Sequence, residues 1–239
     1  MCKFFYPDGT EIGKDEFIRY YSSCYYIGGE KIPRLSPNSH CTENEIDRLL
    51  KQGIKVKIDV VHILAWKLGK INHKESEKSG EFEYASDWKR AEDFDVARYG
   101  KPFEIERIAE FICDNIGELE GQSEKNAQTV LNRLRDEKFY GLGSVYLITL
   151  LYFISKGHYP IYDRFAQMAL DAILKGVKPG DIVQYAELPE KSSRAFSGIM
   201  AHEMSEYIKQ MHDVFKNEYM ANRDIDRALW VYGHLFKTK

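Results

Sequence analysis

The sequence has little cysteine, and the cysteines that it has form no pattern. Four cysteines occur in 239 residues, none at CxxC spacing: Cys2, Cys24, Cys41 and Cys113. This distribution excludes a zinc scaffold of cysteine pairs and a disulfide framework, so we expect reduced thiols.

Long apolar runs are absent as well. No stretch approaches the roughly 18 consecutive apolar residues of a membrane-spanning helix. The first residues, Met1–Phe5, are followed by Pro7, Asp8 and Gly9, without the apolar core or cleavage site of a signal peptide. We therefore expect no membrane span and a cytoplasmic location.

The chain lacks an excess of either charge. Lysine and arginine total 34, aspartate and glutamate total 37, and the formal net charge is -3, which excludes binding to nucleic acid by bulk charge. Locally, residues 51–74 hold six lysines against one acid, Asp59, whereas residues 75–95 hold eight acids and three bases. The basic segment is either a solvated surface that the acidic one partly cancels or a patch that contacts phosphate.

Familiar cofactor and metal motifs are also missing. The sequence contains no GxxxxGK[ST] loop, GxGxxG turn or GxSxG elbow. The segment that begins at His202 has Glu206 where the HExxH zinc motif requires a second histidine. We expect no metal and no organic cofactor.

Helical periodicity dominates what is present. Apolar residues recur at helix spacing, a capping-box pattern opens a short helix at Thr42, Gly53 would stop that helix, and Asn222 would cap the last one. Convincing strands are absent apart from a possible hairpin between Tyr25 and Ile32. The sequence predicts an all-α, two-lobed protein, with further helices at about 15–26, 56–69, 104–118, 124–137, 144–155, 164–175 and 194–218.

Two polar stretches, 71–88 and 176–194, lack a stable period and are predicted to be loops. The first would separate an N-terminal helical region, 1–99, which includes the basic segment 51–74, from a second helical region, 100–239.

One stretch of the sequence carries a pattern that is more specific than helical periodicity. Gly141-Leu142-Gly143 follows the helix at 124–137, and an apolar helix then leads to Tyr159-Pro160-Ile161-Tyr162-Asp163, with Asp163 twenty residues after Gly143. Over about residues 124–170 this order resembles the helix-hairpin-helix DNA glycosylase superfamily, especially its 8-oxoguanine DNA glycosylase-like members. That family has a glycine hairpin, a buried helix and a catalytic aspartate about twenty residues on. The resemblance implies a core of this fold at residues 100–239.

The resemblance also implies roles for the matched residues. Gly141, Gly143, Ser144 and Val145 would bind the DNA backbone, because glycine allows close approach and amides at a helix N-terminus attract phosphate. The alternative is an ordinary turn in which Ser144 caps the next helix. Asp163 would be the catalytic residue that stabilises the sugar cation and activates water. It is also a good N-cap, and the two roles are compatible.

The sequence departs from the family pattern at three places. Bifunctional members carry a lysine two residues after the second hairpin glycine, where this chain has Val145, and valine cannot form the Schiff base that strand cleavage needs. An active enzyme would be monofunctional or would use another lysine, such as Lys156. The iron–sulfur cysteines of some relatives are missing, and Tyr140 replaces the usual proline before the hairpin.

Base excision requires a pocket for the flipped base, lined by aromatic and polar groups. The candidates are Tyr146, Tyr159, Tyr162, Arg164 and Trp230. For each aromatic residue, packing in the core is the alternative.

The functional hypothesis is a DNA-repair N-glycosylase that excises a damaged base from double-stranded DNA through Asp163 and needs no cofactor. The alternative is a non-catalytic protein of the same fold that binds nucleic acid or another protein, favoured by the acidic balance and by Val145. The hairpin itself does not distinguish DNA from RNA.

Overall fold

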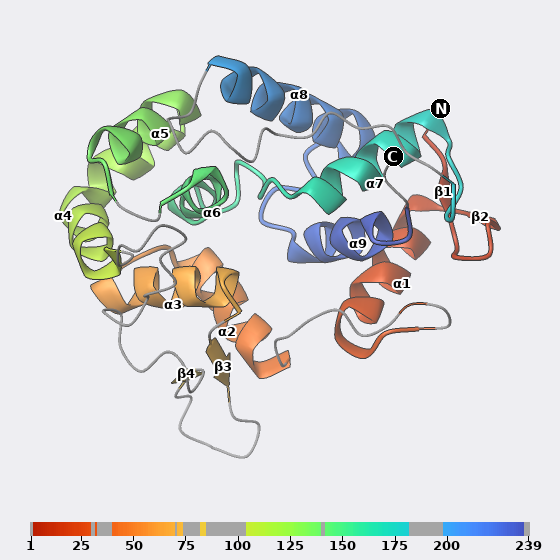
Figure 1. The fold of residues 1–239 in the computed structure, drawn as a ribbon, viewed down its shortest axis with the longest axis horizontal. Coiled ribbons are helices and arrows are strands. Elements are labelled where there is room, and N and C mark those ends of the chain that lie inside the picture. The colour runs from red at the N-terminus through yellow and green to blue at the C-terminus, as the bar shows by residue number, and fades with distance from the viewer. Residues whose placement is uncertain are drawn as a thin grey trace. The chain divides into compact units, whose positions relative to one another are not determined.

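The computed structural model describes residues 2–29, 32, 40–69, 71–73, 82–84, 104–139, 142–181 and 198–236 (Figure 1). Helices predominate among them, which confirms the all-α prediction. They are α1 (Lys14–Ile27), α2 (His40–Gln52), α3 (Lys57–Lys67), α4 (Ile105–Ser123), α5 (Ala127–Asp136), α6 (Ser144–Ile154), α7 (Arg164–Lys175), α8 (Gly198–Phe215) and α9 (Arg223–Gly233). No helix in this part of the chain is long and apolar enough to cross a membrane.

Two small antiparallel sheets were not predicted. β1 (Phe4–Phe5) pairs with β2 (Glu11–Ile12), and β3 (Ile71–His73) pairs with β4 (Phe82–Tyr84). The second sheet lies in the stretch predicted to be a loop, 71–88, so that prediction is wrong for these six residues. The hairpin expected between Tyr25 and Ile32 is confirmed only in part: α1 runs to Ile27, and an antiparallel bridge with two backbone hydrogen bonds joins Gly29 to Ile32. Strands this short leave little alternation for a sequence pattern to detect.

Three helix ends test the expected signals. Asn222 caps α9, since its side chain accepts a hydrogen bond from the amide of Asp224. Gly53 follows α2 with φ of +74°, the left-handed conformation that suits glycine at the end of a helix. The expected start at Thr42 is wrong, because α2 begins at His40 and Thr42 is fully buried inside the helix.

The chain divides into two compact units. Unit 1 is built from Met1–Ser36, Pro160–Lys191 and Gly198–Lys239, and unit 2 from Pro37–Tyr159 and Ser192–Ser197. This division differs from the expected boundary at residue 99, which itself lies outside the described residues. The difference arises because α1, near the N-terminus, packs against α9, near the C-terminus.

The core of unit 1 is aromatic. α9 packs between α1 and α7, and the rings of Phe17, Tyr21 and Tyr232 meet at centroid distances of 5.0 Å. The Tyr21 hydroxyl donates a hydrogen bond of 2.8 Å to the carbonyl of Phe5, which fastens β1 to α1. Burial raises the pKa of both tyrosines, so their hydroxyls stay protonated.

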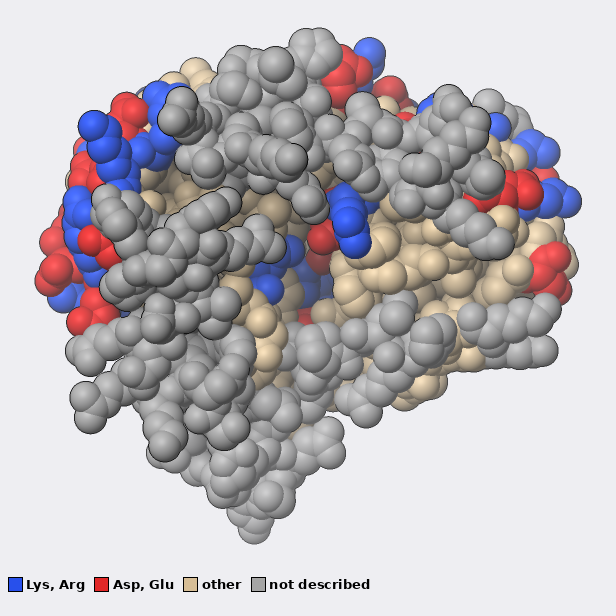
Figure 2. All heavy atoms as spheres, in the orientation of Figure 1, with Lys and Arg blue, Asp and Glu red and all other residues tan. Residues whose placement is uncertain are grey.

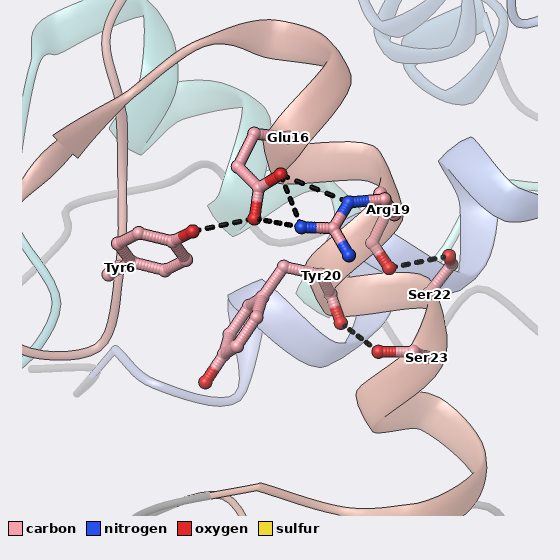
Figure 3. A network of polar contacts seen from close by, with 6 residues as sticks. All are labelled: Tyr6, Glu16, Arg19, Tyr20, Ser22 and Ser23. Atoms are coloured by element: carbon pink, nitrogen blue, oxygen red, sulfur yellow. Dashed lines mark hydrogen bonds and ion pairs between the residues drawn. The ribbon is translucent and has the colours of Figure 1, made fainter.

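A surface network adds a second link between the N-terminal segment and α1. The Tyr6 hydroxyl donates a hydrogen bond of 2.6 Å to the Glu16 carboxylate, and the Arg19 guanidinium donates hydrogen bonds to the same carboxylate (Figure 3). The hydrogen bond from Tyr6, followed by that from Arg19, lowers the pKa of Glu16. The Glu16 carboxylate therefore stays ionised, and keeps its ion pair with Arg19, across the neutral pH range.

Unit 2 has its core where α3, α4 and α6 meet. Trp66 of α3 lies edge-on to Phe153 of α6, and its indole donates a buried hydrogen bond of 2.8 Å to Glu43 of α2. From Leu147 to Ile154 every residue of α6 is buried, as its apolar sequence predicts. In the first turn Val145 is 42% exposed and Tyr146 is half-buried.

Tyr232 and Tyr21 offer a matched test of this core. Both side chains are fully buried, but no described residue hydrogen-bonds the Tyr232 hydroxyl, whereas that of Tyr21 is satisfied. An unsatisfied buried hydroxyl costs about 1–3 kcal/mol. We expect Tyr232→Phe to raise the free energy of unfolding by about 1 kcal/mol, and Tyr21→Phe to lower it by a similar amount. Urea denaturation measures both, and equal losses in the two variants would contradict the assignment.

Candidate functional site

The start of α6 presents two main-chain amides that have no partner among the described residues. Hydrogen bonding within the helix begins with the amides of Tyr146 and Leu147, which both donate to the Gly143 carbonyl. The amides of Ser144 and Val145 have no such partner, as is usual for the first turn of a helix. Of the predicted backbone-binding residues, Gly143, Ser144 and Val145 therefore open one helix, and Gly141 lies outside the described residues.

Gly143, rather than Ser144, is the N-cap of α6. Its φ of -77° is available to any residue, and a Cβ built on it meets nothing within 4 Å. The fold thus does not require glycine at this position. A side chain placed here would project over the amides of the first turn, so this glycine keeps the approach to them open.

Val145 occupies the position in α6 where the family pattern has a lysine. Lys156, the other lysine considered, bonds Glu120 at 3.3 Å, and its stem lies where a side chain at Gly53 would be. Lys156 therefore has a structural explanation within unit 2.

Asp163 caps α7. Its Oδ1 accepts a hydrogen bond of 2.8 Å from the amide of Phe165, and its side chain is half-buried. No other hydrogen bond or ion pair joins this carboxylate to a described residue, so Oδ2 is left for a ligand. The site thus combines a fixed carboxylate with an unused oxygen.

Arg164 follows Asp163 but forms no ion pair with it. The side chain is exposed and its guanidinium lies over the ring of Phe165, 4.7 Å from the centroid. No described carboxylate pairs with Arg164, which leaves its positive charge beside Asp163 available to an anion such as phosphate.

Trp230, like Arg164, is a predicted pocket residue that the structure places near the start of α7. It lies edge-on to Phe165 at 6.4 Å and to His234 at 4.4 Å, and the rings of Phe165 and His234 stack with centroids 3.5 Å apart. We call Asp163, Arg164, Phe165, Trp230 and His234 the Asp163 cluster. Phe165 and His234 were missed by the sequence analysis, although the four-residue spacing of Trp230 and His234 does place them on one face of the last helix.

No ring contact in the described residues joins the three predicted pocket tyrosines to the Asp163 cluster. Tyr162 is 4% exposed and packs against Tyr207 of α8, whose hydroxyl donates to the Ile161 carbonyl at 3.1 Å. The alternative interpretation, core packing, thus describes Tyr162. Tyr146 and Tyr159 are half-buried and belong to unit 2.

The described part of the basic segment is a mixed surface. Lys51, Lys55 and Lys57 are exposed, but Lys57 pairs with Glu110 of α4 at 2.6 Å. The Asp59 carboxylate accepts hydrogen bonds from the amides of Lys55 and Val56, at 2.8 and 3.0 Å, so these two amides already have an anionic partner.

Charges of both signs also alternate over α4 and α5 (Figure 2), where ion pairs join Arg107 to Glu104 and Arg133 to Glu118. The described part of the basic segment is thus balanced by carboxylates of α4, whereas the acidic segment 75–95 that was expected to cancel it lies outside the described residues except for 82–84. Lys70 and Lys74 lie outside those residues.

Comparisons of the chain with models of known protein families, with curated proteins and with solved structures found no match.

Gly233 sets the geometry of the Asp163 cluster. A Cβ on Gly233 would lie 2.0 Å from the carbonyl oxygen of Phe165 and 2.8 Å from its Cα, which is closer than atoms can approach. The backbone of α9 therefore touches the first turn of α7, and only glycine permits that contact. This requirement left no signal in the sequence pattern.

We expect Gly233→Ala to lower the free energy of unfolding by about 2 kcal/mol or more, because overpacking here displaces backbone. Gly117→Ala is the matched control, since Gly117 lies within α4 and a Cβ there meets nothing within 4 Å. That substitution should raise stability by about 0.5–1 kcal/mol through helix propensity. Thermal unfolding measures both, and a Gly233→Ala variant as stable as the parent protein would contradict the close contact.

Proposed function

We propose that the protein is a monofunctional DNA N-glycosylase that uses Asp163 to excise a damaged base. The observation that carries the proposal is the state of the Asp163 carboxylate. One oxygen is fixed by the Phe165 amide, and the other has no partner among the described residues. A carboxylate positioned in this way is ready to act on charge that develops in a substrate.

The chemistry is cleavage of the bond between the sugar and the base. As this bond breaks, its electron pair leaves with the base and the sugar acquires oxocarbenium character. A nearby carboxylate stabilises that cation, as carboxylates do in glycoside hydrolysis generally. Water then adds to the sugar carbon, which leaves an abasic site.

Two features support hydrolysis without strand cleavage. Val145 carries no amine, and the ammonium of Lys156 is paired with Glu120. A Schiff base requires a free amine.

The free amides of Ser144 and Val145 support binding to the phosphate backbone. They open a helix of three turns, and Gly143 leaves their approach unobstructed. The exposed guanidinium of Arg164 supplies a separate positive group beside Asp163.

A second candidate is a non-catalytic protein that binds nucleic acid or another protein. The mixed charge around Lys57 and Glu110 favours a protein partner, because extensive phosphate binding needs a larger excess of positive charge. The two candidates differ in what they predict for Asp163.

The first test uses two abasic-site analogues in the same duplex. A pyrrolidine analogue carries a protonated ring nitrogen that mimics the sugar cation, whereas a tetrahydrofuran analogue is neutral. We expect the protein to bind the pyrrolidine duplex about tenfold to 150-fold more tightly, as a hydrogen bond of about 1.5–3 kcal/mol to a charged group would give. Asp163→Asn should abolish the preference but keep the fold, because asparagine caps helices as well as aspartate does.

Asp213→Asn is the matched control, since Asp213 is an exposed carboxylate on α8 of the same unit. It should leave the preference intact. If the Asp163→Asn variant keeps the preference, the catalytic assignment is wrong. If the protein binds the tetrahydrofuran and undamaged duplexes equally, recognition of damage is wrong.

The second test concerns the start of α6. Gly143→Asp and Gly143→Asn introduce equally good N-caps of nearly equal size, but only aspartate places a negative charge beside the free amides. We expect Gly143→Asp to weaken binding of damaged and undamaged duplexes by about tenfold relative to Gly143→Asn, and to reduce the salt dependence of binding. Fluorescence anisotropy across a salt series measures this effect. Equal affinities of the two variants would show that this helix start does not contact phosphate.

A further inference from the structure

His234 is held in one orientation by two independent contacts. Its ring stacks on Phe165 with an interplanar angle of 21°, and its Nδ1 lies 2.7 Å from the carbonyl oxygen of Trp230, one helical turn earlier. A residue at the end of a helix needs neither contact for the helix to form. Together they fix both the plane of the imidazole and the direction of its edges.

The contact with Trp230 also fixes which nitrogen carries the proton. A carbonyl oxygen only accepts hydrogen bonds, so Nδ1 of His234 must be the donor. Burial lowers the pKa of His234 below its ordinary value, although the Trp230 carbonyl and the Asp163 carboxylate oppose this effect. The neutral ring therefore presents an unprotonated Nε2, and no described residue bonds that atom.

Phe165 connects this imidazole to Asp163. Its amide holds Oδ1 of Asp163, and its ring carries the imidazole of His234. The charges that act on His234 are those of Asp163 and Arg164, both at the start of α7. Two hydrogen-bond acceptors, Oδ2 of Asp163 and Nε2 of His234, are thus positioned through one residue and lack described partners.

We infer that His234 is a further catalytic residue, whose Nε2 acts with the Asp163 carboxylate to hold and deprotonate the attacking water. The inference rests on the proposed function. A water molecule has two hydrogens, and two acceptors would bind both, which leaves an oxygen lone pair for the sugar cation.

The atoms balance in this step. The bond from sugar to base breaks and its electron pair goes to the base nitrogen. The water oxygen bonds the sugar carbon, and one water proton passes to Nε2 of His234. His234 then passes that proton to the departed base, directly or through solvent, so the products are the free base and an abasic sugar. No oxidant, reductant or metal enters the balance.

The structural part of the test needs no substrate. In protein labelled with ¹⁵N-histidine, the His234 signals should show the tautomer with the proton on Nδ1. Its pKa should fall in Asp163→Asn, because a negative neighbour is removed, and should not change in Asp213→Asn. Saturation with the pyrrolidine duplex should shift the Nε2 signal. An unchanged pKa in Asp163→Asn would overturn the inference, as would an Nε2 signal that bound pyrrolidine duplex does not move.

The catalytic part compares His234→Phe with His234→Gln. Phenylalanine keeps the stack on Phe165 but lacks an acceptor, whereas glutamine places an amide oxygen close to the position of Nε2. Single-turnover release would be measured on duplexes that carry uracil, hypoxanthine, 8-oxoguanine or 7-methylguanine. We expect His234→Phe to slow release about 100-fold or more at unchanged duplex affinity, and His234→Gln to recover part of the rate.

The pH profile separates catalysis from structure. The wild-type rate should fall as the pH drops through the pKa of His234, because the protonated ring cannot accept. His234→Gln should lose this dependence. Release by His234→Phe at the wild-type rate would overturn the inference. If no base is released, the proposed function fails, and the histidine spectra still decide whether His234 and Asp163 share a site.

Discussion

The contact between the backbones of α9 and α7 at Gly233 is the constraint on which the Asp163 cluster depends. Because Gly233 has no Cβ, the end of α9 reaches the main chain of Phe165. That approach brings His234, the next residue, over the ring of Phe165, whose amide in turn holds Asp163. A packing requirement of the core thus fixes the relative position of two polar side chains.

Asp163 combines a structural and a proposed chemical role without conflict. Capping uses one carboxylate oxygen, and a helix N-terminus stabilises negative charge nearby. The carboxylate is therefore oriented before a substrate arrives, and the second oxygen has no partner among the described residues. An aspartate that capped through both oxygens would be a poor candidate for catalysis. Arg164, whose guanidinium lies over the Phe165 ring, forms no ion pair with the Asp163 carboxylate.

Local features of the fold were predictable from the sequence because short-range physics determines them. Helical periodicity located the helices, and the signals at Gly53, Asp163 and Asn222 marked ends that the structure confirms. The start of α2 was misplaced because Thr42 is buried inside the helix instead of capping it. The short strands β3 and β4 were missed because three residues are too few to show alternation.

The arrangement of the site was less predictable because it depends on contacts between distant segments. Residues 163–165 and 230–234 lie far apart in the chain, and no periodic pattern indicates that α9 crosses the first turn of α7. Trp230 and Arg164 could be predicted from the sequence, but Phe165 and His234 could not, because their proximity depends on the stacking of rings from distant segments. Tyr162 was predicted to line the pocket because its burial against Tyr207 cannot be told from exposure in the sequence.

The most direct measurement of the central claim is mass spectrometry of the bases that the protein releases from DNA damaged by oxidation, alkylation and deamination. A mixed substrate removes the need to guess the lesion. The account predicts that at least one free base appears, that the strands stay intact at the resulting abasic sites, and that Asp163→Asn releases none. Absence of any released base, or equal release by Asp163→Asn, would contradict it.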